Sequence, residues 1–415
     1  MNTFTAIKGF KDILPEDAPL WRRLEDVARD VARRYDFQEL RPPIAEATEI
    51  FARGIGQATD IVEKEMYTFT VKGEKKETKI TLRPEATAGM VRAVLEHHLA
   101  DGGRTARLFC LGPMFRHERP QMGRQRQFHQ LDVEIFGDPG PEVDAELLAW
   151  LTTFLSEIGL GDLSINLNSL GCPQCRPAYR AKLVEFFTER QEGLCPDCRR
   201  RLELNPLRII DCKSESCRKL VEGAPRMLDH LCQDCTDHFG ALKKLLDLME
   251  LKYEINPNLV RGLDYYTRTA FEVLSGDLGA QSAVAGGGRY DGLCKELGGD
   301  DIPGIGFAAG LERLVMLLKT KESTPEAGPD YYLALLHESA LSVAFKLVEN
   351  LRSQGLRVAA DWKPGSLKSR LKRADKSGAA KVIMLGQDEL AQKEAKVRDL
   401  KSHEQTGFDL TPFLK

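Results

Sequence analysis

The segment 108–137 contains the residues of this chain that are best suited to chemistry. Two apolar runs, 108–115 and 135–136, flank a stretch with four arginines, which are Arg116, Arg119, Arg124 and Arg126. This order predicts a strand, a basic loop and a second strand. An arginine side chain forms paired hydrogen bonds with oxygen atoms, and carboxylates beside it can receive an amine. The segment could therefore bind a phosphate and an amine side by side.

Gln130 and Glu134 lie four residues apart in the second predicted strand. Side chains alternate between the two faces of a strand, so both point to the same side. A polar face inside an apolar hairpin costs free energy unless a ligand binds there. The alternative interpretation is an exposed hairpin whose ion pairs are solvated.

A second candidate segment is Thr81–Thr87, in which Pro84 is followed by Glu85, Ala86 and Thr87. We expect a helix over 86–98, so Glu85 would lie at the turn before it. A carboxylate at this turn could bind an ammonium group. An acid at the start of a helix is also favoured by the helix dipole, which is a purely structural explanation.

The segment Arg261–Tyr266 includes Leu263, Asp264 and Tyr265 and is polar for a connection between apolar strands, although a surface turn would also explain it. Further along, 285–292 holds three consecutive glycines before Tyr290, in what we expect to be a turn that leads into a helix. Glycines let the backbone approach a ligand closely. The segment has neither the P-loop lysine nor the spacing of a dinucleotide fingerprint.

The segment 304–314 begins with small residues and predicts a strand that runs into a helix, with Arg313 near the helix start. An arginine at that position can reach a polyphosphate chain. The glycines here could instead serve only the close packing of a strand on a helix.

Composition limits the class of protein. A chain of 415 residues is too long for one core and predicts two or three domains. The net charge of −3 means that a nucleic-acid partner would have to bind a local basic face. No stretch of eighteen apolar residues and no signal peptide is evident, so we expect a cytoplasmic protein without a membrane partner.

Eight of the ten cysteines cluster between residues 172 and 235. Disulfides rarely persist in the cytosol, and paired thiolates at this spacing suit tetrahedral zinc. Two sites with four cysteine ligands each, or one such site with spare thiols, are both compatible with the spacing. The cysteines are Cys172, Cys175, Cys195, Cys198, Cys212, Cys217, Cys232 and Cys235. We expect Cys110 and Cys294 to be buried, inert thiols.

The elements that must position these residues follow from periodicity. Apolar residues at helical spacing predict helices at 17–35 and 142–158. Strand signals predict a proline-bounded strand at 37–44 and further strands at 253–255, 269–274 and 281–285. The predicted domains are a catalytic part at 1–171, a cysteine-rich helical insertion at 172–250, a second catalytic part at 251–322, a linker at 323–330 and a C-terminal domain at 331–415. The last domain alternates strands and helices, which predicts a small α/β domain with a largely parallel sheet.

Taken together, Glu85, Arg116, Glu134, Arg261 and Arg313 resemble the pattern of class II aminoacyl-tRNA synthetases. The segments 81–85 and 261–266 are similar to those of the histidyl-tRNA synthetase family in particular, and the resemblance extends from 8–15 to the C-terminal domain. Segments 37–43, 115–134 and 304–313 resemble motifs 1, 2 and 3 of that class. The implied fold class is α+β: an antiparallel sheet with flanking helices, a helical cysteine-rich insertion and an α/β anticodon-binding domain.

The resemblance implies ATP-dependent activation of L-histidine to histidyl-adenylate, followed by transfer to the 3′ end of tRNA(His), by a homodimer that uses ATP and Mg²⁺. Arg261 and Arg116 would be catalytic on the α-phosphate, and Arg124 and Arg313 would bind ATP with Arg116. The implied histidine-binding residues are Glu85, Ala86, Thr87, Gln130, Glu134, Leu263, Asp264, Tyr265, Tyr266 and Tyr290. Where many relatives carry glycine, this chain has Ala86.

The C-terminal domain would bind the anticodon of the tRNA. Over 363–376, six basic residues and one acid give a local charge of +5, which suits phosphate contacts, although a solvated helix face would look similar. The implied tRNA-binding residues are Gln121, Arg126, Lys368, Arg370 and Arg373.

Two other classes compete with this interpretation. The first is a catalytically inactive, synthetase-like regulatory subunit of ATP phosphoribosyltransferase. Such relatives generally lack the anticodon-binding domain and lose catalytic residues, whereas this chain has both the C-terminal domain and Arg261. The second is a zinc-ribbon nucleic-acid adaptor, which explains the cysteines but not the other domains.

Overall fold

The computed structural model describes residues 4–56, 59, 61–72, 77–121, 123–161, 163–275, 283–321 and 328–414. The chain divides into two compact units, Met1–Glu322 and Ser323–Lys415. Of the predicted linker at 323–330, residues 323–327 lie outside the described residues. Within the described ranges, every helix is too short or too polar to cross a bilayer.

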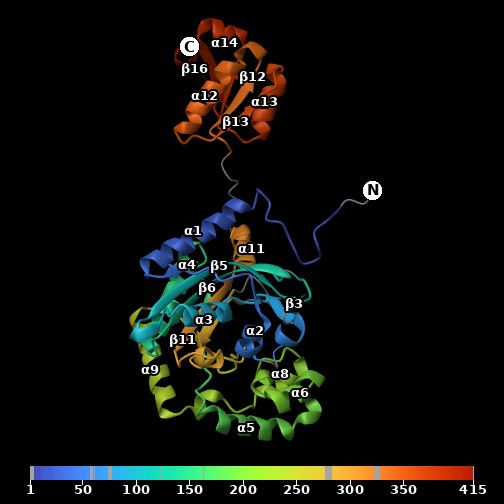
Figure 1. Ribbon diagram of the computed structural model, residues 1–415, viewed down its shortest axis with the longest axis vertical. Coiled ribbons are helices and arrows are strands. Elements are labelled where there is room, and N and C mark those ends of the chain that lie inside the picture. Colours follow the sequence, from blue (N-terminus) through green and yellow to red (C-terminus); the bar gives the residue numbers. More distant parts are fainter. Residues whose placement is uncertain are drawn as a thin grey trace. The chain divides into compact units, whose positions relative to one another are not determined.

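Unit 1 is built on an eight-stranded sheet with the order β1-β5-β6-β11-β10-β9-β7-β8. Strands β5, β6 and β11 of this sheet are labelled in Figure 1. All neighbouring pairs from β5 to β7 are antiparallel, and the edge pairs β1/β5 and β7/β8 are parallel. The strands are β1 Gln38–Glu39, β5 Ala106–Phe115, β6 Gln127–Phe136, β7 Ser164–Ser169, β8 Glu254–Ile255, β9 Thr267–Leu274, β10 Ala283–Arg289 and β11 Gly304–Gly310. The antiparallel sheet that we predicted is confirmed.

One face of this sheet packs on helices α1 (Ala18–Arg34), α4 (Pro141–Glu157), α9 (Gln233–Leu248) and α11 (Leu311–Lys321). Leu24, Trp150, Leu242 and Leu314 from these helices join Val133 of β6 in one apolar core. The predicted helices at 17–35 and 142–158 are confirmed to within two residues. Burying this face leaves the opposite face of the central strands free for a site.

A smaller antiparallel sheet, β2-β4-β3, flanks the opposite side with α2 (Thr48–Ile55) and α3 (Thr87–Glu96). Its strands are β2 Ala45–Ala47, β3 Tyr67–Lys72 and β4 Glu77–Leu82. The strand predicted at 37–44 is reduced to the two residues of β1 at the sheet edge, because Pro42 and Pro43 cannot donate ladder hydrogen bonds.

The cysteine-rich segment is helical, with α5 (Arg176–Thr188), α6 (Pro196–Leu204), α7 (Leu207–Ile210) and α8 (Glu215–Val221). These helices share a small core of their own. Helix α9 follows them: Cys235 in its first turn joins the core of the insertion, and Phe239, Leu242 and Leu246 pack into the main core of unit 1.

The glycine-rich segment corrects one sequence expectation. Gly286, Gly287 and Gly288 lie inside strand β10 and not in a turn, and the short helix α10 (Leu293–Glu296) follows. A Cβ atom on Gly287 would collide with the backbone of Gly306 on the neighbouring strand, so glycine is required by close strand packing. Of the strand predicted at 281–285, residues 281–282 lie outside the described residues.

Unit 2 has a five-stranded sheet with the order β13-β12-β14-β15-β16. Its strands are β12 Tyr331–Leu335, β13 Val358–Asp361, β14 Lys381–Leu385, β15 Glu394–Asp399 and β16 Gln405–Asp409, and its helices are α12 Leu341–Ser353, α13 Leu367–Lys376 and α14 Gln387–Gln392. The parallel pairing that we predicted holds for β13, β12 and β14, whereas β15 and β16 are antiparallel. The small α/β domain is confirmed, with a mixed sheet.

Candidate active site

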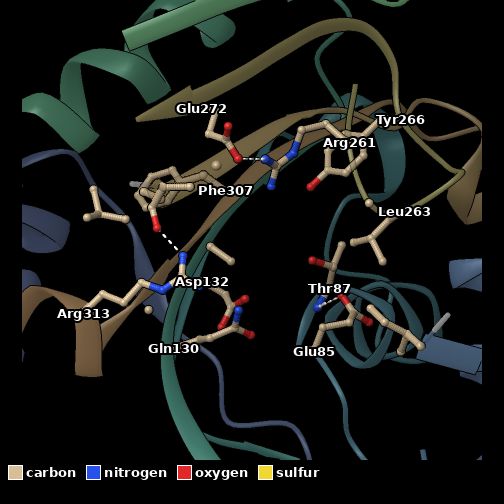
Figure 2. Close-up of a pocket in the computed structure, with 18 of the residues that line it drawn as sticks. Glu85, Thr87, Gln130, Asp132, Arg261, Leu263, Tyr266, Glu272, Phe307 and Arg313 are labelled. Carbon is tan, nitrogen blue, oxygen red and sulfur yellow. Dashed lines mark hydrogen bonds and ion pairs between the residues drawn. The ribbon is translucent and has the colours of Figure 1, made fainter. Parts of the chain in front are cut away.

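A cavity of about 520 Å³ opens on the free face of the large sheet in unit 1. Its walls come from β6, β10, β11, the start of α3 and the segment 256–266 (Figure 2). Twelve of the residues predicted to bind or activate a substrate line it: Glu85, Thr87, Arg116, Arg124, Gln130, Glu134, Arg261, Leu263, Tyr265, Tyr266, Tyr290 and Arg313.

Strand alternation explains the floor of the cavity. Gln130, Asp132 and Glu134 of β6 line it, while Leu131 and Val133 between them are buried in the main core. On the neighbouring strand β11, the opposite residues are Gly310, Ala308 and Gly306. These small residues keep the space above β6 open, and a Cβ atom on Gly306 would overlap the Glu134 carboxylate.

Glu85 and Glu134 are fully buried and hydrogen-bonded. The Glu85 carboxylate accepts from the backbone N–H groups of Thr87 at 2.9 Å and Ala88 at 3.0 Å, so it also caps helix α3. Glu134 accepts from the Thr87 hydroxyl at 2.7 Å and from the hydroxyl of Tyr290. Burial raises the pKa of both carboxyl groups, and that of Glu134 most strongly. A cation in the cavity would restore their charged forms.

Asp132 also lines the cavity, and neither of its carboxylate oxygens has a hydrogen-bond partner among the described residues. Its side chain is buried, and burial together with the nearby Glu85 raises the pKa of this carboxyl group well above its usual value. The Oε1 atom of Gln130 is also buried and unpartnered within the described part of the chain. Unpaired buried acceptors of this kind are costly, so they favour a cationic donor as the ligand.

Four arginines also line the cavity. Arg261 pairs with Glu272 at 3.1 Å and lies over the ring of Tyr266. Arg313 donates to the backbone carbonyl oxygen of Gly123 at 3.3 Å. Burial and the positive charge of Arg124 lower the pKa of the Arg313 guanidinium. Figure 2 shows Arg313 beside Asp132 and Gln130 on one side of the cavity, and Arg261 beside Glu272 and Tyr266 on another.

Arg116 and Arg124 are the other two arginines that line the cavity. Arg116 donates from Nε to the carbonyl oxygen of Pro84 at 2.8 Å and lies over the ring of Phe128. Arg124 pairs with Glu118 at 3.1 Å. Both arginines are only partly buried, so their guanidinium N–H groups can donate hydrogen bonds to the oxygens of a polyphosphate.

Some predicted residues lie outside the cavity. Ala86 is buried beside Glu85, and Asp264 accepts a hydrogen bond from Asn205 at 2.8 Å. Gln121 and Arg126 lie in the connection between β5 and β6. Lys368, Arg370 and Arg373 belong to unit 2, where Arg370 is buried and pairs with Asp361.

Sequence reasoning missed Asp132, Glu272 and Glu118. The alternation that identified Gln130 and Glu134 also places Asp132 on the same face, so its signal was available. Glu272 and Glu118 matter because they pair with Arg261 and Arg124. For Glu272 in β9, no local spacing reveals that pairing.

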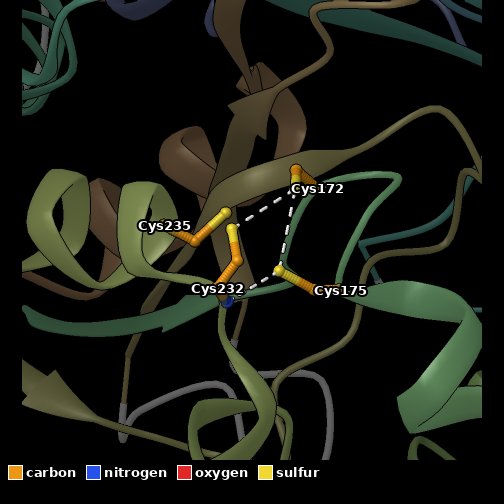
Figure 3. A group of neighbouring side chains, drawn as sticks. All are labelled: Cys172, Cys175, Cys232 and Cys235. Atoms are coloured by element: carbon orange, nitrogen blue, oxygen red, sulfur yellow. Dashed lines mark hydrogen bonds between the residues drawn. The ribbon is translucent and has the colours of Figure 1, made fainter.

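The eight clustered cysteines form two groups whose pairing the sequence left open. The outer thiol group contains Cys172, Cys175, Cys232 and Cys235 (Figure 3), and the inner thiol group contains Cys195, Cys198, Cys212 and Cys217. Within each group all sulfur atoms lie within 4.8 Å of one another. Cys110 and Cys294 are buried, as predicted, and burial raises the pKa of each thiol to about 12.

An antiparallel sheet whose open face holds arginines beside buried carboxylates is typical of a class II aminoacyl-tRNA synthetase. The family model for histidyl-tRNA synthetase matches residues 9–175 and 204–314, and that for the anticodon-binding domain matches 330–415. The chain therefore belongs to the histidyl-tRNA synthetase family, as its motifs indicated. Residues 176–203, which include Cys195 and Cys198, fall between the two matched segments.

Individual relatives agree with this assignment. The chain is 50% identical over 401 residues to a histidine–tRNA ligase of Desulfotalea psychrophila, covering 96% of this chain and 92% of that one. It is 49% identical over 408 residues to one of Geobacter sulfurreducens, covering 98% of each. Among solved structures, apo S. aureus histidyl-tRNA synthetase superposes with a TM-score of 0.82 at 34% identity, covering 100% of both chains.

Proposed function

We propose that this protein activates L-histidine with ATP to form histidyl-adenylate and then transfers the histidyl group to the 3′ end of tRNA(His). It is a ligase of the histidine–tRNA ligase type. The observation that carries the proposal is one cavity lined by four arginines and three buried carboxylates, on a chain that is about half identical to histidine–tRNA ligases over nearly its whole length.

In the first step, a carboxylate oxygen of histidine attacks the α-phosphorus of ATP and pyrophosphate leaves. Such a transfer needs positive charge around the equatorial oxygens and no covalent nucleophile from the protein. Arg116 and Arg261 would hold the α-phosphate from two sides, and Arg124 and Arg313 would hold the far phosphates. Mg²⁺ bound with ATP would neutralise further phosphate charge, held chiefly by the phosphate oxygens because Glu118 and Glu272 already pair with arginines.

The carboxylates would bind the histidine zwitterion. Glu85, Asp132 and Gln130 would surround the α-ammonium group, whose three N–H donors match the unpaired acceptors of Asp132 and Gln130. Glu134 and Tyr266 would form hydrogen bonds with the imidazole ring. Tyr290 donates a hydrogen bond to Glu134. An amino acid without a ring N–H would leave these groups buried and unpaired, which can reduce the rate by about 10⁴-fold.

The remaining partners follow from the same function. A synthetase with an anticodon-binding domain acts on tRNA, and Lys368 and Arg373 on α13 would contact phosphates. We further propose a homodimer with segment 37–43 at its interface, a cytoplasmic location beside tRNA, and structural Zn²⁺ in the thiol groups. Sedimentation velocity of the purified chain would test the dimer.

Exchange of pyrophosphate into ATP tests the central proposal. With L-histidine the full chain should catalyse exchange, and with the other amino acids it should not. Absence of exchange with every amino acid would overturn the proposal and favour the regulatory-subunit alternative.

A further inference from the structure

The helices of the insertion have too small an apolar core to hold their shape alone. Thirteen buried side chains from Cys175 to Cys235 form this core, and four of them are cysteines. Domains with so few buried apolar groups usually need disulfides or a metal. No disulfide joins any of the ten cysteines, all of which lie in the described part of the chain.

The sulfur positions fit a tetrahedral metal. A Zn–S bond of about 2.3 Å requires sulfur atoms about 3.8 Å apart. In the outer thiol group, Cys172 Sγ lies 3.6 Å from Cys175 Sγ and 3.7 Å from Cys232 Sγ. In the inner thiol group, Cys195 Sγ lies 3.8 Å from Cys212 Sγ. These separations are far too long for a disulfide of about 2.05 Å.

Backbone donors complete both groups. The N–H of Cys232 donates to Cys175 Sγ at 3.1 Å, and the N–H of Cys195 donates to Cys217 Sγ at 3.2 Å. Hydrogen bonds to sulfur stabilise thiolate ligands and orient them. Each group is therefore shaped for a closed structural site with four sulfur ligands and no open position.

Three side chains of the insertion donate to the segment that carries Arg261 and Tyr266. Arg176 donates to the carbonyl oxygen of Tyr266. The amide Nδ2 of Asn205 donates to Asp264 at 2.8 Å, and Arg208 Nη1 donates to the carbonyl oxygen of Arg261 at 2.6 Å.

Each donor is close in sequence to a thiol group. Arg176 directly follows Cys175 of the outer group, and Asn205 and Arg208 lie between Cys198 and Cys212 of the inner group. Asp211 and Lys213, on either side of Cys212, line the cavity itself. Displacing the ligands would therefore displace the donors.

We infer that each thiol group binds one Zn²⁺, and that the two ions hold Arg176, Asn205 and Arg208 against the 261–266 segment so that Arg261 keeps its place beside the α-phosphate. The part that concerns Arg261 rests on the proposed function. The ions take no part in the chemical step, and Arg208 is a positioning residue.

Metal analysis of the full-length protein tests the first half independently of activity. Protein purified with Zn²⁺ and without chelator should contain two zinc ions per chain. The variant Cys195→Ser/Cys217→Ser should contain one, and Cys172→Ser/Cys235→Ser should contain one. Cys110→Ser/Cys294→Ser, which alters the two thiols outside both groups, should retain two. A folded chain without metal in which the eight clustered thiols react with a thiol reagent would overturn the inference.

The coupling is tested with Arg208→Ala, which leaves all eight thiols in place. It should retain two zinc ions and lower kcat for histidine-dependent pyrophosphate exchange roughly tenfold, with a smaller change in KM for histidine. Arg208→Lys keeps a cationic donor and should recover part of kcat. Arg180→Ala is the matched control, because Arg180 donates to Glu203 within the insertion at 2.9 Å.

The outcomes separate the two proposals. An unchanged kcat for Arg208→Ala with two bound zinc ions would overturn the coupling. Equal loss of kcat in Arg208→Ala and Arg180→Ala would also overturn it, because the effect would then be general to the insertion. Absence of exchange by the unmodified chain would instead overturn the proposed function. The inference of two bound zinc ions would still be tested separately by the metal analysis.

Discussion

At the scale of single residues, Arg261 is the side chain on which adenylate formation should depend most. Its guanidinium pairs with Glu272 and lines the cavity. The reaction there requires positive charge and does not require a nucleophile from the protein. We expect Arg261→Ala to lower the rate of histidine-dependent pyrophosphate exchange by roughly 10²- to 10³-fold. Filter binding of tRNA should stay near normal, since the substitution removes no predicted tRNA contact.

Glu272→Gln gives a matched comparison for Arg261→Ala. It weakens the support of the guanidinium but keeps the positive charge in the cavity, so its loss of exchange should be smaller. Equal rates for Arg261→Ala and the unmodified chain would contradict the role assigned to Arg261.

Asp132 presents a carboxylate without a partner among the described residues, and its substitution should affect stability and binding in opposite directions. The pKa of Asp132 is raised in the folded chain. At pH values between the usual carboxyl pKa and this raised pKa, Asp132 is protonated in the folded chain and ionised in the unfolded chain. Stability therefore falls as pH rises through that window, and an amide does not titrate. We expect ligand-free Asp132→Asn to unfold a few degrees above the unmodified chain at pH 8, with a smaller difference at pH 4.

The same substitution should weaken binding of histidine roughly 30-fold or more, because the ammonium group loses a charged acceptor. Thermal unfolding from pH 4 to 8 and calorimetric titration with histidine measure the two effects. Asp26→Asn, on an exposed turn of α1, should change neither. A destabilised Asp132→Asn with normal affinity for histidine would show that Asp132 serves the fold and not the ligand.

At the scale of elements, the sequence predicted most helices and strands because their apolar periodicity is local. The helices α1 and α4 needed only the spacing of their apolar residues. The segment Gly286–Gly288 was predicted as a turn because glycine favours turns, whereas the requirement here is the close neighbouring strand β11. Such a contact depends on tertiary pairing, which no window of sequence contains.

Helix α13 carries the next prediction. Its exposed side carries Lys368, Lys372 and Lys376, whereas Arg370 is buried against Asp361. We expect Lys368→Ala/Lys372→Ala/Lys376→Ala to raise KM for tRNA and to reduce the salt dependence of tRNA binding by about two to three counterions. Pyrophosphate exchange should be unchanged, because the first step needs no tRNA.

Arg370→Ala serves as the contrast to the lysine variant. It removes an internal ion pair, so it should lower the thermal stability of unit 2 before it affects the salt dependence of binding. An unchanged salt slope for the triple lysine variant would exclude these three lysines as phosphate contacts.

At the scale of the whole molecule, the sequence indicated the cysteine cluster but could not assign its pairs. The outer thiol group combines the first and the last cysteine pair of the insertion, and the inner thiol group lies between these pairs in the sequence. Grouping the pairs with their nearest neighbours in sequence would therefore give the wrong sets of four ligands. Chain topology decides which pairs meet. Likewise, the cavity draws its walls from residues as distant as Glu85 and Arg313, and only their family pattern indicated that they meet.

The division into two units gives the last prediction. The described residues that line the cavity belong to Met1–Glu322, and unit 2 has its own apolar core around Leu333, Leu347 and Ile383. A chain ending at Glu322 should fold and keep histidine-dependent exchange within about tenfold. Its kcat/KM for aminoacylation of tRNA should fall roughly 100-fold or more, because tethering a second binding unit contributes about that factor in effective concentration. Circular dichroism establishes folding and the two assays establish the steps. A folded truncated chain that lost exchange and charging equally would mean that unit 2 contributes to the cavity, and the assignment of separate tasks to the two units would fail.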